Sequence, residues 1–222
     1  MQNKKVKFIN ESYNKLLYFL LGGVDDTNIL SGNHLAIDKD TIENASTTMT
    51  TWLLNINRAF ELLIKNHKIS KEDMKKFNWI DVGCGSGIAS IYASLNCKFS
   101  NQLLFDFDLR NISLAKKNFD ISRKSLLFNQ NHLEPKIIRE NAQNILISDY
   151  FKKNCIVYMF NPFDQKIMKS FIINNANFLK TNNSIIIYIN DKYNDLIQEL
   201  LSLNPKDIRR NDKYKISTYL VR

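Results

Sequence analysis

Residues 79–87 of this 222-residue chain read WIDVGCGSG, and the stretch holds three of the six glycines in the sequence. Glycine loses more conformational entropy on folding than any other residue, so such a cluster marks a tight turn or a place where a ligand approaches the backbone closely. Residues 79–82 are mostly apolar and predict a buried strand. We therefore expect a strand, a glycine-rich turn and a helix that begins near Gly87.

Downstream of this turn, short runs of β-branched and aromatic residues alternate with helix-like segments. Strands are predicted at 79–82, 103–107, 136–139, 156–160 and 184–189, and helices near 87–96, 109–119, 143–152, 164–179 and 191–202. This alternation predicts right-handed βαβ units and a mostly parallel sheet with helices on both faces. A turn at residues 211–212, between 207–210 and 213–221, predicts a terminal antiparallel hairpin. The expected fold is α/β with seven strands.

The first 75 residues predict a helical N-terminal extension, with a looser stretch around 22–33. Lysines followed by apolar residues superficially resemble a signal peptide, but polar residues interrupt the apolar run and no small-residue cleavage site follows. An amphipathic helix is the better interpretation, with one apolar face formed by Ile9, Tyr13, Leu16, Leu17 and Leu20. We expect residues 1–75 to be a lid or substrate wall and residues 76–222 to be the ligand-binding domain.

Composition limits the class of protein. No window of about 18 apolar residues exists, so no membrane span is expected. The three cysteines form no CxxC pair and the three histidines are scattered, which favours reduced thiols in a cytoplasmic protein without a metal site. The net charge of +9 allows a nucleic-acid partner. The basic residues come in dispersed pairs without interleaved aromatics, so a generally lysine-rich composition is the favoured explanation.

Two common nucleotide-binding patterns do not fit the glycines. A dinucleotide site needs GxGxxG, and the third position falls on Ile88 or Ser90, depending on the register. A P-loop, GxxxxGK followed by Ser or Thr, is absent. The stretch does match DxGxGxG, and it resembles motif I of class I S-adenosylmethionine (SAM)-dependent methyltransferases. That resemblance implies a Rossmann-like fold and a loop that passes beneath the methionine and ribose portions of SAM.

Two later segments carry the same resemblance. The segment FDFDLRNISLAKKN places Asp106 at the end of the next strand, with Ala115 and Asn118 at the offsets typical of the family. Asp106 is the expected ligand of the ribose hydroxyls; Asp108 is its competitor, although a helix N-cap is the favoured role for Asp108. Residues 139–142, RENA, resemble the element that contacts adenine, and a plain polar loop is the alternative.

The segment FNPFD at residues 160–164 resembles the NPPY motif of amino-methylating enzymes. It departs from that motif at Phe163 and Asp164, and FNPF also resembles a poorly characterised methyltransferase subgroup with helical N-terminal extensions. Asp164 is either a helix N-cap or a general base. The catalytic candidates are Asn161 and Asp164. The implied SAM ligands are Asp81, Gly83, Cys84, Gly85, Gly87, Asp106, Phe107, Asn141, Ala142 and Asn161.

The sequence therefore predicts methyl transfer from SAM to an oxygen or nitrogen nucleophile of a small molecule, glycan or protein. The alternatives are an RNA or DNA methyltransferase, for which the net charge is the argument, and a non-catalytic SAM-binding module. Thr47 and Thr48 lie where related enzymes bring polar groups to the SAM carboxylate, and His34 lies in a segment that could fold over the site. The sequence does not indicate the oligomeric state.

Overall fold

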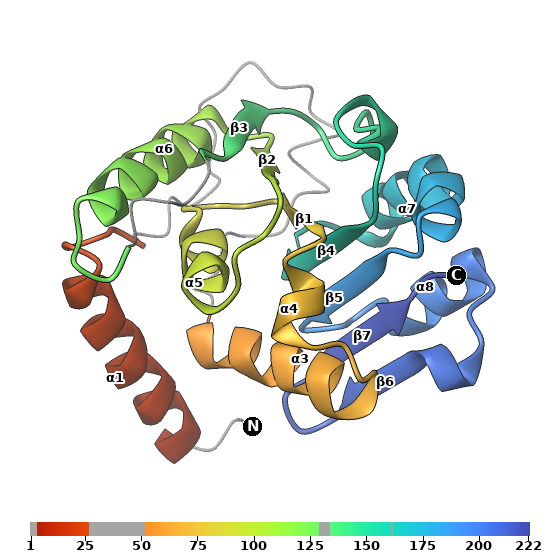
Figure 1. Cartoon of the computed structure of the whole chain (residues 1–222), viewed down its shortest axis with the longest axis horizontal. Helices are drawn as coiled ribbons and strands as arrows, with labels where there is room; N and C mark the ends of the chain where they lie inside the picture. Colours follow the sequence, from red (N-terminus) through yellow and green to blue (C-terminus); the bar gives the residue numbers. More distant parts are fainter. Residues whose placement is uncertain (1–3, 27–51, 129–133, 161) are drawn as a thin grey trace.

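The computed structural model describes residues 4–26, 52–128, 134–160 and 162–222. Within these ranges, seven strands form one sheet in the order β3-β2-β1-β4-β5-β7-β6 (Figure 1). They are β1 (Asn78–Val82), β2 (Gln102–Asp106), β3 (Lys136–Arg139), β4 (Cys155–Phe160), β5 (Ile185–Ile189), β6 (Ile208–Asn211) and β7 (Ile216–Leu220). Strands β1 to β5 pair in parallel, and β7 is antiparallel to both β5 and β6. The predicted fold class and the terminal hairpin are confirmed.

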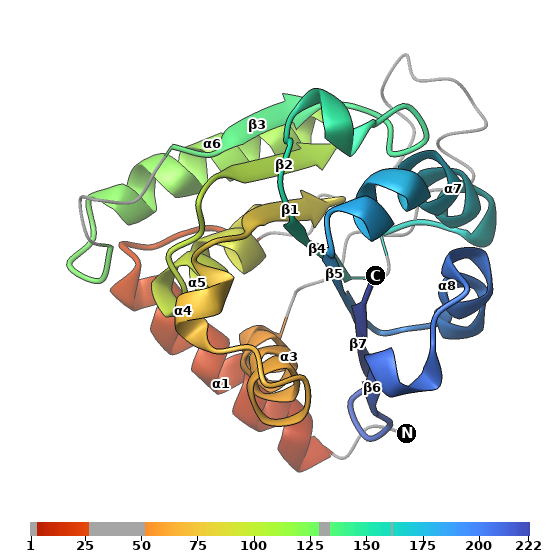
Figure 2. The ribbon, with the colours of Figure 1, turned by 45° about the vertical axis from the view of Figure 1, so that its right-hand side comes forward.

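Helices cover both faces of the sheet (Figures 1 and 2), and every residue of the parallel strands β1, β2 and β5 is buried as a result. One layer contains α1 (Lys4–Leu20), α3 (Leu53–Asn66), α5 (Ile88–Asn96) and α6 (Leu109–Arg123), and the other contains α7 (Gln165–Thr181) and α8 (Asn194–Leu201). The short helix α4 (Lys71–Met74) leads into β1. Side chains alternate along each strand: Trp79 and Tyr158 stack at 5.3 Å in one core, whereas Ile80 and Val157 lie in the other.

The N-terminal helix α1 is rotated relative to the prediction. Ile9, Leu16 and Leu20 are exposed, whereas Asn10 and Asn14 are buried. The burial of Asn14 has a structural reason, because its Oδ1 accepts a hydrogen bond from the Leu53 N–H at 3.2 Å. The N-cap residue of α3, Trp52, has no side chain that could accept this bond. A polar contact with a neighbouring helix therefore decides which side of α1 faces inward.

The predicted helix at 143–152 is wrong. Only a 3-10 turn, η1 (Ile147–Asp149), forms there. Asn175 of α7 takes over the backbone groups that a helix would use: its side chain accepts from the Ile147 N–H at 2.7 Å and donates to the Ile145 carbonyl at 3.0 Å. These contacts, made from 28 and 30 residues away, hold the segment as an irregular connection.

Two predictions from composition concern the cysteines and membrane-spanning helices. Cys84, Cys97 and Cys155 are free and buried, as predicted. None of the described helices is long and apolar enough to cross a lipid bilayer.

Candidate active site

The glycine-rich turn, residues 83–87, connects β1 to α5 at the point where the strand order reverses between β1 and β4. Ligands of open α/β sheets bind at such a switch point, outside the carboxyl ends of the strands. Gly83, Gly85 and Gly87 have φ values of 70°, 51° and 74°. This left-handed backbone conformation favours glycine. We call residues 83–87 the glycine loop.

Close packing against neighbouring residues also favours glycine at two of these positions. A Cβ added at Gly83 would lie 2.6 Å from the Cβ of Pro162, and a Cβ added at Gly87 would lie 3.0 Å from the Cβ of Ala115. The glycine cluster by itself predicts that a ligand approaches Gly83 closely. The structure adds Pro162, which lies in the loop after β4, at the same edge of the sheet. Close packing therefore joins the glycine loop to the expected reacting end of the site.

Asp106 ends β2 beside the glycine loop and is 5% exposed. Its Oδ2 accepts from the Gly85 N–H at 3.0 Å, and its Oδ1 accepts from the Asp108 N–H at 2.9 Å. Burial raises the pKa of the Asp106 carboxyl, and the N–H groups of Asp108 and Gly85 partly oppose that shift. The Asn111 side chain also hydrogen-bonds Asp106. An ionised carboxylate accepts about four hydrogen bonds, so these three contacts leave acceptor capacity for a ligand hydroxyl.

Asp81, the acid of DxGxGxG, is buried beneath the loop. Its Oδ2 accepts from the Ser90 hydroxyl at 2.5 Å, and Ser90 Oγ in turn accepts from Trp79 Nε1 at 2.8 Å. Burial raises the pKa of Asp81 to about 7, while the Ser90 hydrogen bond lowers it and nearby Asp106 adds to the rise. This chain of contacts ties β1 to α5 and holds the glycine loop at both ends.

Asp108 and Asp164 both cap helices in the structure. Asp108 accepts from the Arg110 N–H at 2.8 Å and pairs with the Arg110 side chain, as expected for the N-cap of α6. Burial opposes ionisation of Asp108, but Arg110 holds its pKa below the usual value. Asp164 Oδ1 accepts from the Ile167 N–H at 3.0 Å at the start of α7. The N-cap role predicted for each acid is observed.

The other predicted ligands lie along the same edge of the sheet. Cys84 is buried in the glycine loop, and burial raises the pKa of its thiol. Phe107 follows β2, and its carbonyl accepts from Arg139 Nε at 3.0 Å. Asn141 Oδ1 accepts from the Gln143 N–H at 3.0 Å, next to buried Ala142. The carboxyl ends of β1, β2 and β3 therefore bring these candidates to one edge.

Some predicted residues cannot be placed. Asn161, Thr47, Thr48 and His34 lie outside the residues that the structure describes. Phe163, which follows in the same motif as Asn161, is described and buried, and its ring lies 6.4 Å from that of Phe171 in α7. Phe163 therefore packs into the core between the sheet and α7.

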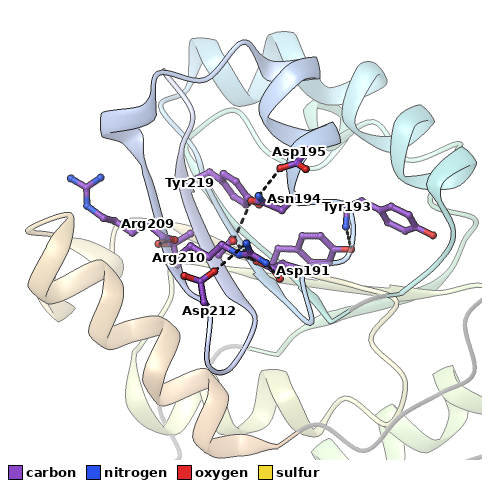
Figure 3. Close-up of polar contacts among 11 residues, drawn as sticks. Asp191, Tyr193, Asn194, Asp195, Arg209, Arg210, Asp212 and Tyr219 are labelled. Carbon is purple, nitrogen blue, oxygen red and sulfur yellow. Dashed lines mark hydrogen bonds and ion pairs between the residues drawn. The ribbon is translucent and has the colours of Figure 1, made fainter. Parts of the chain in front are cut away.

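A polar network at the end of β5 was missed by the sequence argument (Figure 3). Asp191 Oδ2 accepts from Arg210 Nε at 2.7 Å and from the Ser217 hydroxyl at 2.5 Å. Nearby, Asn194 Oδ1 accepts from the Tyr219 hydroxyl at 2.7 Å. The network fastens the β6–β7 hairpin to the segment that joins β5 to α8. Asp191 and Arg210 are 19 residues apart, so only the tertiary structure shows the pairing.

Three cation–aromatic pairs lie at the same end of the sheet. Lys192 Nζ lies 5.1 Å from the centre of the Tyr193 ring, just after β5. In the β6–β7 turn, Lys213 Nζ lies 5.3 Å from the Tyr214 ring, and Arg58 Cζ from α3 lies 3.7 Å from it. Two of these pairs are between neighbours in sequence, and only the contact between Arg58 and Tyr214 joins residues that lie far apart in the chain.

The arrangement fits SAM at the glycine loop. The three left-handed glycines present no side chain at positions 83, 85 and 87, and a buried carboxylate at the end of β2 accepts a hydrogen bond from a loop N–H. Among the described residues, no group of three or more histidine, cysteine, aspartate or glutamate side chains could hold a metal ion.

Comparisons with known proteins agree with this geometry. Residues 55–218 match the profile of the family described as Methyltransferase small domain. A search of curated proteins finds no match. The fold is similar to a putative rRNA-methylase from Clostridium thermocellum, at 13% identity and a TM-score of 0.50, over 79% of this chain and 98% of that one.

Two further solved structures show the same general similarity. A ribosomal protein L11 methylase from Lactobacillus delbrueckii subsp. bulgaricus matches at 14% identity and a TM-score of 0.46, over 74% of this chain and 80% of that one. An S-adenosylmethionine-dependent methyltransferase from Clostridium acetobutylicum ATCC 824 matches at 17% identity and a TM-score of 0.44, over 95% and 65% of the two chains.

Proposed function

The chain belongs to the methyltransferase small domain family, and we propose that it transfers the methyl group of SAM to an oxygen or nitrogen nucleophile held beside the loop that follows β4. The family makes the chain a SAM-dependent methyltransferase with SAM as methyl donor. The observation that carries the proposed site is the buried Asp106 carboxylate, 3.0 Å from the Gly85 N–H in the glycine loop. We assign the ribose hydroxyls of SAM to Asp106 and its methionine portion to the glycine loop.

When bound, SAM supplies an electrophilic methyl carbon, whose bond to sulfur breaks as a bond to the acceptor atom forms. The chain's contribution is alignment of the acceptor, which can supply most of the rate enhancement of such a displacement. Pro162 packs against Gly83 and thereby keeps the β4 loop next to the cofactor loop. Asn161 is proposed to orient the acceptor, and Asp164 to receive its proton.

We propose a small molecule, glycan or protein as the acceptor. A nucleic acid is the second candidate, and the cation–aromatic pairs formed by Lys192, Lys213 and Arg58 favour it. Single-stranded nucleic acids bind surfaces that combine positive charge with aromatic rings. Incubation with labelled SAM and fractionated lysate separates the candidates, and label found mainly in RNA or DNA would reverse their order.

The cofactor site is tested by calorimetry with SAM and NAD on wild type and Asp106→Ala. We expect SAM binding and no NAD binding by the wild type, and a loss of SAM affinity of at least about tenfold in the variant, the scale of one lost charged hydrogen bond. Asp120→Ala is the matched control, because it removes an exposed carboxylate from α6. Undiminished SAM binding by Asp106→Ala would refute the assignment.

Three expectations belong to this proposal as well. They are membership of the FNPF subgroup, a cytoplasmic location, and a division into a helical extension at residues 1–75 and a SAM-binding domain at residues 76–222. A non-catalytic SAM-binding role would be indicated if every fraction of the lysate stayed unlabelled while SAM still bound.

A further inference from the structure

The end of α1 and the residues after it reach the glycine loop from the far end of the sequence. Helix α1 ends at Leu20 and is followed by Gly22 and Gly23, whose φ values are 87° and 85°. The Gly23 N–H donates to the Tyr18 carbonyl at 2.9 Å. This left-handed ending turns the chain toward α6. A Cβ added at Gly22 would lie 3.3 Å from Ile121 Cγ2, so the approach to α6 is close. We call residues 22–26 the strap.

Asn118 of α6 joins the strap to the glycine loop. Its Oδ1 accepts from the Asp25 N–H at 2.8 Å, and its Nδ2 donates to the Asp25 carbonyl at 2.6 Å and to the Ser86 carbonyl at 2.9 Å. Asn118 is completely buried, so loss of these partners would leave a buried amide unsatisfied. A single side chain thus fixes the backbone of both segments.

Asp26 makes the second connection. Its Oδ1 accepts from the Ser86 hydroxyl at 2.7 Å, and its Oδ2 accepts from the Tyr18 hydroxyl at 2.8 Å. Burial and the neighbouring Asp26 charge raise the pKa of Tyr18, so this hydroxyl stays protonated as a donor. Ser86 is 60 residues from Asp26 and lies in the middle of the glycine loop.

The loop needs such external support because of its composition. Ser86 lies between Gly85 and Gly87, both in left-handed conformation, and glycine backbones have the largest conformational entropy to lose. Asp106 and the Phe105 carbonyl hold the β2 side of the loop, through the N–H groups of Gly85, Gly83 and Cys84. On the other side of the glycine loop, Asp26 and Asn118 hold Ser86 through its hydroxyl and its carbonyl. A loop fixed before binding costs less entropy when the ligand arrives.

We propose that Asp26 is a positioning residue of the cofactor site: through Ser86 it holds the glycine loop in the conformation that binds SAM. The inference rests on the proposed position of SAM at the glycine loop. Helix α1 and the strap then form part of the cofactor site, since Tyr18 fixes Asp26. By linkage, SAM stabilises the contact between strap and loop to the same degree that the contact favours SAM.

The test measures SAM affinity by calorimetry for Asp26→Ala, Ser86→Ala and the double variant. Each single variant is expected to weaken SAM binding about tenfold, the scale of one hydrogen bond to a charged group. The double variant is expected to bind no more weakly than either single variant, because both remove the same contact. Asp120→Ala, which removes an exposed carboxylate from α6, should stay within about twofold of wild type.

Hydrogen exchange on the SAM-free protein provides a readout independent of binding. Asp26→Ala should speed exchange of the amides at residues 85–87 and leave the β6–β7 hairpin unchanged. If Asp26→Ala does not fold, Tyr18→Phe keeps the ring and removes only the hydroxyl that holds Asp26. This variant should weaken SAM binding about threefold, a fraction of the loss expected from removing the carboxylate.

The outcomes separate this inference from the proposed function. A lower melting temperature with unchanged SAM affinity in Asp26→Ala, or losses that multiply to about a hundredfold in the double variant, would overturn the inference. If Asp106→Ala abolishes SAM binding at the same time, the cofactor site stands and only the role of Asp26 fails. If Asp106→Ala binds SAM normally, the proposed cofactor site itself is wrong.

Discussion

Replacement of Gly83 by alanine tests the contact between the cofactor loop and the loop after β4. The backbone at Gly83 has a φ of 70°, and an L-residue in this conformation costs about 1–2 kcal/mol. The added Cβ would also lie 2.6 Å from the Pro162 Cβ, about 1 Å closer than a favourable carbon–carbon contact. Overpacking of this kind costs about 1–3 kcal/mol more.

We therefore expect Gly83→Ala to lower the free energy of unfolding by about 2–5 kcal/mol, a large fraction of the roughly 5–15 kcal/mol of a typical domain. Urea titrations followed by circular dichroism measure it. Gly23→Ala is the matched control: Gly23 has a φ of 85°, but its added Cβ would meet no atom within 4 Å. This control should lose only the conformational part, about 1–2 kcal/mol.

A second variant isolates the steric part. Gly83→Ala combined with Pro162→Gly removes the Pro162 Cβ that the added Cβ would meet, so the double variant should be more stable than the sum of the single losses implies. The reasoning is refuted if Gly83→Ala and Gly23→Ala lose equal stability. That result would mean that the Pro162 loop moves aside without cost.

Three further variants test charge, capping and packing. Because burial raises the pKa of Asp81 to about 7, its contribution to stability is full at low pH and falls as pH rises from about 4 to 7. Asp81→Asn should therefore gain stability relative to wild type across that range, by at most about 1.4 kcal/mol per pH unit in urea titrations; a difference independent of pH would contradict the shift. Asp164→Asn keeps an efficient N-cap and should lower turnover about a hundredfold or more with SAM affinity intact if Asp164 receives the proton. Unchanged turnover would leave Asp164 only as the cap of α7. Gly87→Ala should lower the melting temperature, because the added Cβ would contact Ala115, and Ala115→Gly should partly restore it. Equal melting temperatures for Gly87→Ala with and without Ala115→Gly would argue against that contact.

Prediction from sequence worked best where the signal is local and periodic. The strands around Trp79 and Phe105 were placed within one residue because short β-branched and aromatic runs distinguish buried strands from the helices between them. The N-caps Asp108 and Asp164 were also recognised, since a cap depends on residues two or three positions away. The helix predicted at 143–152 does not form, because backbone groups of this segment hydrogen-bond the Asn175 side chain instead. No local sequence pattern encodes that contact.

Local sequence patterns predict the α/β class, the terminal hairpin, and the placement of a glycine turn and an acid at the ends of consecutive strands. These features follow from hydrophobic periodicity and turn chemistry, which act over a few residues. Tertiary packing, in contrast, places Asn10 and Asn14 rather than Ile9 and Leu16 on the buried side of α1. It also decided that Asp26 meets Ser86 across 60 residues of chain, because strand order and helix packing, rather than proximity in sequence, determine which side chains share a site.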